Sequence, residues 1–207
     1  MVLPPAKQEN IKLAVDLAWE EFRARGPGVK AAGEGPVCVR FLTETYRVDR
    51  KQGTILDEWG RPAPNRLATL LLHYLTRGDG APLTRQEIGF AQIPGGGFYE
   101  GPFHARIVSR IIHKFGKDPS LLLKCGLDLG GRRADYGDAA MTFSLFPEVP
   151  VVIVVWRGDE EFPASANFVF DASIGNYLAV EDVVVACEEL VNRLSKAAAD
   201  LAGESKR

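Results

Sequence analysis

Cysteine is scarce in this sequence, which has only Cys38, Cys125 and Cys187. The three residues are odd in number, far apart, and never in a Cys-x-x-Cys pair. This spacing argues against a disulfide framework, and it predicts no zinc site and no iron–sulfur cluster held by the chain itself. We expect three reduced and mostly buried thiols, because free cysteine behaves as a small apolar side chain.

Long apolar runs and excess positive charge are also missing. The longest apolar stretch, Val149–Trp156, is far too short to cross a bilayer, and residues 1–6 show no secretory signal. The formal net charge is −2, and no basic run is longer than Gly131-Arg132-Arg133, whereas nucleic-acid binders need a basic surface. The sequence therefore predicts a cytoplasmic protein that binds neither membranes nor nucleic acid.

What remains is ordinary globular composition: 207 residues, 46% hydrophobic and 25% charged, typical of one domain. Apolar residues recur at helical spacing in an N-terminal helix at about 5–25 and in a C-terminal helix at about 180–201. Helical patterns also cover 65–77, 103–115 and 119–124.

Short segments with strand-like patterns lie between and after these helices. They cover residues 37–42, 45–49, 54–57, 87–93, 140–146, 149–156 and 167–171. The last three are joined by short connections, which predicts antiparallel neighbours. Residues 151–155 are apolar throughout, so we expect a central strand covered on both faces. The sequence thus predicts one α+β domain over residues 1–207, with an antiparallel sheet of about five or six strands and helices mainly on one face.

Several segments together resemble an uncharacterised family known only as a domain of unknown function. They are the runs 70–80, 93–99 and 156–171, followed by Tyr177-Leu178 and Glu181-Asp182. The similarity extends from about residue 36 to 195. The resemblance implies a protein of anaerobic bacteria or archaea and carries no established activity. Some relatives are fused to iron–sulfur modules like those beside corrinoid proteins, but this chain lacks such a cysteine cluster, so that chemistry would come through a partner.

Two glycine-rich segments are candidate ligand-binding loops: Gly95-Gly96-Gly97 and Gly130-Gly131-Arg132-Arg133. Such loops can present backbone N–H groups to phosphate, and arginine can hold phosphate or carboxylate with two hydrogen bonds. Neither segment has the spacing of a nucleotide-binding motif, so tight turning is the alternative interpretation. Trp156, at the end of an apolar strand, is a further candidate because it could stack on a flat ligand.

Acidic residues supply the other candidate site. One edge of the sheet would carry an acidic rim, formed by Asp159, Glu161 and Asp171. Asp138, which precedes the first of the three C-terminal strands, would add to it. Such carboxylates can bind a divalent cation or act as an acid–base pair. The alternative is a solvated loop whose charges protect strand ends.

Three functions remain open. The leading hypothesis is an accessory binding module in anaerobic metabolism. It would hold a small anionic cofactor, a metabolite or a protein partner in a cleft lined by 95–97, 130–133 and 156–161. The alternatives are an enzyme that depends on a divalent metal held by Asp159, Glu161 and Asp171, and a purely protein–protein role, for example as a homodimer. The sequence identifies no cofactor and leaves open whether the chain is an enzyme.

Overall fold

The computed structural model describes residues 5–28 and 35–204, which form two lobes. The first lobe contains α1 (Pro5–Arg25), β1 (Val37–Phe41), β2 (Glu44–Asp49), β3 (Thr54–Asp57) and α2 (Asn65–Arg77). The second contains β4 (Glu87–Gly89), η1 (Phe90–Gln92), α3 (Gly96–Phe103), η2 (His104–Val108), α4 (Ser109–Phe115), α5 (Pro119–Asp128), β5 (Arg132–Ala134), β6 (Ala139–Phe146), β7 (Val149–Trp156), β8 (Ser165–Asp171), η3 (Ala172–Asn176) and α6 (Val180–Glu204).

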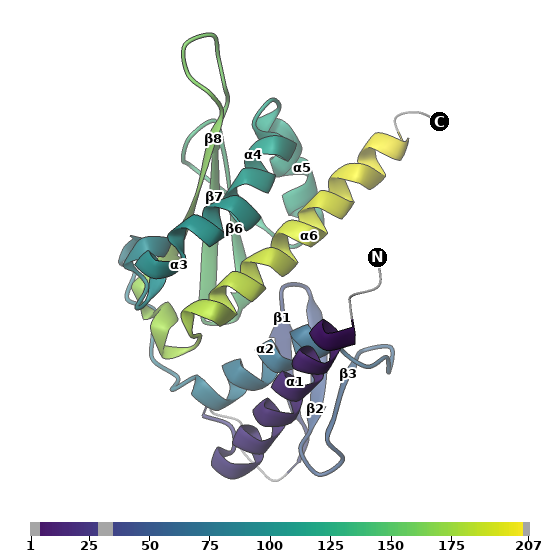
Figure 1. Ribbon diagram of the computed structural model, residues 1–207. Helices are drawn as coiled ribbons and strands as arrows, with labels where there is room; N and C mark the ends of the chain where they lie inside the picture. The colour runs from purple at the N-terminus through teal and green to yellow at the C-terminus, as the bar shows by residue number, and fades with distance from the viewer. Residues whose placement is uncertain (1–4, 29–34, 205–207) are drawn as a thin grey trace.

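The strands form two antiparallel sheets (Figure 1). One has the order β1-β2-β3 and the other the order β4-β8-β7-β6-β5. The α+β class with antiparallel strands is therefore confirmed, while the strands are divided between two sheets instead of sharing one sheet of five or six. The division follows from the chain path, because β1–β3 pair locally through short turns before α2 begins.

Helices α4, α5 and α6 lie on one face of the five-stranded sheet (Figure 1). The side chains of Phe143, Ile153 and Phe168 point to that face and are almost fully buried. The predicted central strand is confirmed as β7, but coverage of both its faces is not. Val152, on the opposite face, stays partly exposed, because the described chain carries no helix there.

Two local expectations were wrong. The helix expected at 103–115 begins at Gly96 and passes through a π-helical turn at His104–Val108. The strand expected at 87–93 ends at Gly89 and continues as a 3₁₀ turn. A further strand, β5, was not predicted, because its three residues carry no strand-like pattern of their own and pair with β6. Short elements of this kind depend on their neighbours more than on local preference.

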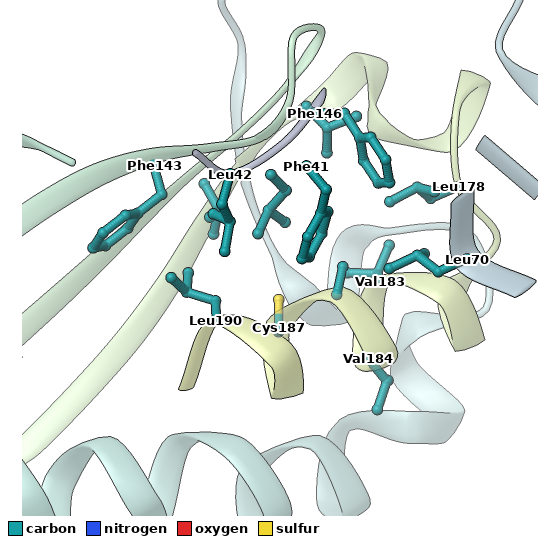
Figure 2. Packing of buried hydrophobic residues seen from close by; sticks show 14 of the residues in the cluster. Phe41, Leu42, Leu70, Phe143, Phe146, Leu178, Val183, Val184, Cys187 and Leu190 are labelled. Carbon is teal, nitrogen blue, oxygen red and sulfur yellow. The ribbon is translucent and has the colours of Figure 1, made fainter. Parts of the chain in front are cut away.

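The two lobes meet at Phe41 and Leu42, at the end of β1. Figure 2 shows both side chains between Phe143 of β6 and the α6 residues Cys187 and Leu190. Leu42 has a left-handed backbone, with φ of 53°, and its N–H donates to the Leu145 carbonyl at 3.0 Å. The buried residues of both lobes consequently form one continuous core.

Charged groups on α6 also tie the lobes together. The Glu188 carboxylate is buried and accepts from Arg66 of α2 and from Arg106 of the π-helical turn. Asp182, also buried, lies 2.8 Å from Nδ1 of His73 on α2. Each carboxylate therefore has the partner that a buried charge requires.

Two of the three cysteines are buried, as the sequence predicts for free thiols. Cys125 and Cys187 are buried and Cys38 is exposed, and all three are free thiols. Burial raises the pKa of the Cys187 thiol well above its ordinary value. Within residues 5–28 and 35–204, no helix has the length and apolar character of a membrane span.

Leu42→Ala is expected to destabilise the protein by about 2–4 kcal/mol, because it leaves a cavity where the lobes meet. Alanine keeps the left-handed backbone strain, so the loss reports on the buried side chain alone. Urea denaturation measures it. The control is Leu13→Ala on α1, where the leucine is 57% exposed and the expected change stays within about 0.5 kcal/mol. Equal losses in the two variants would contradict the packing described above.

His73 makes the contact between α2 and α6 dependent on pH. The hydrogen bond to Asp182 raises the pKa of His73, burial lowers it, and the charges of Glu21 and Arg77 act in opposite directions, with a net upward shift. A raised folded-state pKa stabilises the protein fully below the unfolded value of about 6.5, and this contribution is lost as the pH rises through the folded-state pKa.

His73→Gln should therefore lower the free energy of unfolding by about 1–2 kcal/mol near pH 6, and by much less near pH 9. Urea denaturation at the two pH values measures the difference. His113→Gln, which removes an exposed histidine, should keep the pH dependence of the wild type. A loss in His73→Gln that is the same at both pH values would show that the ion pair does not contribute.

Candidate functional site

The uncovered face of the five-stranded sheet, which points away from the helices, carries the candidate site. Strand register places one row of side chains across it: Arg132 of β5, Thr142 of β6, Val152 of β7 and Val169 of β8. The last three are partly exposed. Directly opposed residues of antiparallel strands point to the same face, so this row is a surface on which a ligand can lie.

A strap, defined as residues 135–138 between β5 and β6, crosses part of this face. Gly137 has φ of 54°, and a Cβ there would lie 2.9 Å from Cγ1 of Val154, so only glycine lets the strap pack so closely. The Tyr136 hydroxyl donates to Oε1 of Glu87 on β4 at 2.7 Å. That hydrogen bond, together with the negative charge of Glu87, raises the pKa of Tyr136.

The Tyr136 groove lies on the uncovered face beside the strap and has a volume of about 310 Å³. Its floor is apolar and its rim is polar, with contributions from Pro150, Val152, Val169, Arg85, Glu87 and Tyr136. This volume is at the small end of the range for ligand pockets, about 300–1,000 Å³. The groove therefore suits a small molecule with an apolar body.

Arg85, on the rim, has a strained backbone. Its φ is 62°, a left-handed value that costs a residue with a Cβ on the order of 1 kcal/mol. The Asp171 carboxylate fixes the turn, because it accepts from the N–H of Arg85 at 2.6 Å, from Thr84 and from the N–H of Ser173. Burial raises the pKa of Asp171, but these hydrogen bonds outweigh it and hold the pKa well below its usual range.

Two arginines at this face are free to bind an anion. The guanidinium groups of Arg85 and Arg132 have no hydrogen bond or ion pair with any residue in 5–28 or 35–204. Arg132 lies opposite Thr142 and points to the uncovered face. Arg133 lies opposite Met141, whose side chain is buried on the helical face. Of the two predicted arginines, only Arg132 therefore shares a face with the Tyr136 groove, although it does not line the groove.

The predicted glycine loops do not meet. Gly95, Gly96 and Gly97 follow β4 at one edge of the sheet, whereas Gly130 and Gly131 precede β5 at the other edge. Four strand spacings of about 4.8 Å, roughly 19 Å in total, separate the edges. Gly95 adopts φ of 83° where α3 begins, and Gly130 adopts φ of 72° after α5. Both glycines allow a tight turn, and the expected common cleft does not form.

The predicted metal ligands do not meet either. Asp171 lies at the end of β8, and Asp159 and Glu161 lie beyond its start, so roughly 20 Å of strand separates them. Asp159 caps its own turn by accepting from the N–H groups of Phe162 and Glu161, which lower its pKa. In the described part of the chain, no three His, Cys, Asp or Glu residues are placed to hold a metal ion.

Trp156 lies at the end of β7, on the same face as Val152, and is 40% exposed. It therefore shares the uncovered face with Arg132. Sequence reasoning missed Arg85, Glu87 and Tyr136. An aromatic residue inside the short Asp-Tyr-Gly-Asp connection at 135–138 was a usable signal, because side chains in such tight connections often lie on the adjoining sheet. Arg85 offered no signal of this kind.

Most of the chain matches the model of one protein family. The family model described as "Domain of unknown function (DUF3786)" matches residues 21–193. No curated protein and no solved structure matches the chain.

The glycines at the start of α3 allow a test of their structural role. A Cβ on Gly96 would lie 2.0 Å from the Phe90 carbonyl oxygen, whereas a Cβ on Gly97 would meet its nearest atom at 3.9 Å. Gly96→Ala is therefore expected to lower the stability by more than about 2 kcal/mol. Gly97→Ala should leave it unchanged or raise it by up to about 1 kcal/mol, since alanine favours helix. Thermal and urea denaturation measure both, and a stable Gly96→Ala variant would refute the close contact.

Proposed function

The chain belongs to the family described as a domain of unknown function (DUF3786), and from its geometry we propose that it is a binding module for a small carboxylate-bearing metabolite. The ligand lies in the Tyr136 groove on the uncovered face of the five-stranded sheet. The observation that carries this proposal is Arg85, which is held in a strained backbone conformation at the groove rim with an unpaired guanidinium. Backbone strain persists where the surrounding structure imposes it, which is common at ligand-binding sites.

The chemistry of the groove supports an organic anion with an apolar body. Pro150, Val152 and Val169 supply an apolar floor, and Tyr136 lines the groove beside them. A carboxylate can accept two parallel hydrogen bonds from a guanidinium, an arrangement about twice as strong as a neutral hydrogen bond. Arg85 is placed to orient the charged end of the ligand while its body lies on the floor.

The charge balance supports the same ligand class. Two carboxylates, Asp171 and Glu87, line the groove, but hydrogen bonds from the protein already engage both. Arg85 is the one cation among the lining residues of the groove, and its guanidinium has no partner within residues 5–28 and 35–204. An incoming carboxylate therefore finds in Arg85 a donor without a partner, and Thr142 adds a hydroxyl to the groove lining.

The competing hypothesis of a metal-dependent enzyme has no geometric support, because Asp159 and Asp171 lie at opposite ends of β8. A binding role in the cytoplasm of an anaerobe, with any iron–sulfur or corrinoid chemistry supplied by a partner, stays part of the proposal. The anaerobic setting and the iron–sulfur or corrinoid partner come from the resemblance, whereas the cytoplasmic location comes from the composition of the sequence.

Arg85→Gly tests the proposal without disturbing the fold. Glycine accepts the left-handed backbone, so stability should stay within about 1 kcal/mol of the wild type, while the guanidinium is lost. The probes are succinate, benzoate and 2-oxoglutarate at millimolar concentration, with methylamine as a cationic control. We expect at least one carboxylate to raise the melting temperature of the wild type and to give heat in titration calorimetry, and Arg85→Gly to weaken that binding at least about tenfold.

Arg132→Ala and Arg133→Ala form the matched pair for this experiment. The two residues are neighbours on β5 and both are exposed, but only Arg132 points to the uncovered face. Arg132 does not line the groove, so Arg132→Ala should weaken carboxylate binding only modestly and only at low salt, through the loss of a positive charge on the same face, and Arg133→Ala should not weaken it. Binding that survives in Arg85→Gly, or that falls equally in both arginine variants, would rule out this groove as the site.

A further inference from the structure

The connection between β7 and β8 extends beyond the rest of the sheet as an arm, defined here as residues 157–164 (Figure 1). The arm has internal order. The N–H of Asp159 donates to the Phe162 carbonyl at 2.9 Å, and the Asp159 carboxylate accepts the N–H groups of Glu161 and Phe162. The tip is therefore a preformed turn, which lowers the entropy that an interaction with another molecule would cost.

Aromatic side chains are exposed where the arm joins the sheet. Phe162 is 69% exposed and Trp156 is 40% exposed, and with Pro163 they line a shallow groove of about 520 Å³. Tryptophan is among the residues that contribute most energy to protein interfaces. Large apolar side chains that gather at one exposed place, and are not needed for the core, mark an interaction surface.

The charges around this groove are mainly negative. Asp159, Glu160 and Glu161 lie at the tip, and Asp138 lines the groove. Arg157 is the one cation among the lining residues. The hydrogen bonds that Asp159 accepts hold its pKa below the ordinary value, so it stays ionised at neutral pH. Aromatic faces beside carboxylates favour arginine and lysine, through cation–π contact and ion pairing together.

We propose that the arm is a docking surface for a basic, extended segment of a partner protein. An arginine or lysine of the partner lies on the faces of Trp156 and Phe162, and a neighbouring basic residue pairs with Glu160 and Glu161. A second copy of this chain is a poor occupant, because two arms brought together would place like charges opposite one another. The Tyr136 groove lies on the same face but uses other residues, so the two proposals stand or fall separately.

Binding of a labelled probe peptide tests the proposal on the full chain. The probe is a fluorescein-labelled nine-residue peptide of alternating arginine and leucine, and the reference replaces each arginine with glutamate. We expect fluorescence anisotropy to show saturable binding of the basic peptide only. Binding should weaken at least about tenfold in Phe162→Ala, weaken in the double variant Glu160→Gln, Glu161→Gln, and fall as salt rises.

Phe98→Ala is the matched control, because Phe98 is 93% exposed and lies on α3, which follows the edge strand β4 and is not part of the arm. This variant should bind the basic peptide as the wild type does. The proposal is overturned if the basic peptide does not bind, or if Phe98→Ala weakens binding as much as Phe162→Ala. It is also overturned if sedimentation shows a dimer of this chain that Phe162→Ala abolishes, since a second copy would then be the occupant.

Discussion

The contact of Phe41 and Leu42 with β6 and α6 is the interaction on which the rest of the structure depends. The Leu42 N–H bonds to the backbone of β6, and the Phe41 ring lies 5.2 Å from that of Phe146, which in turn stacks on Tyr74 of α2 at 3.9 Å. This one contact joins β1, β6 and α2. Burying such large side chains offsets the strain of the left-handed Leu42 backbone, since each contributes about 1.5–3 kcal/mol.

The same packing determines which face of the larger sheet is left open. Because α6 lies between the first lobe and the strands, the helices that follow β4 gather on its side of the sheet. Among the described residues, the opposite face is crossed only by the short strap that contains Tyr136. A face with this composition, apolar in the middle and carrying arginines at both flanks, is too polar to be a core and too apolar to be ordinary solvated surface. The binding proposal therefore follows from how the lobes join.

The sequence predicted the helices and strands whose apolar residues recur at a regular spacing. It missed the short elements that form only because a neighbouring strand pairs with them. The long helix ending near residue 201 and the apolar strand β7 follow from their own residues, because repeated apolar spacing requires a covered face. β5 has three residues and exists only because β6 lies beside it. The same limit applies to the candidate site residues. Arg132 and Trp156 were found by residue type, but the strand register that separates Arg132 from Arg133 cannot be read from one sequence.

Asp159 and Asp171 show why residue type alone is a poor guide to a metal site. A carboxylate next to a turn can bind a cation, or it can accept the N–H groups of its own backbone, and the two uses look identical in sequence. In the structure both aspartates take the second use, and each fixes the shape of its own turn. The turn at Asp171 holds Arg85 at the groove, and the turn at Asp159 holds the arm in its shape. These two aspartates therefore position other residues, and in both proposals the contacts with a ligand or partner are made by side chains other than theirs.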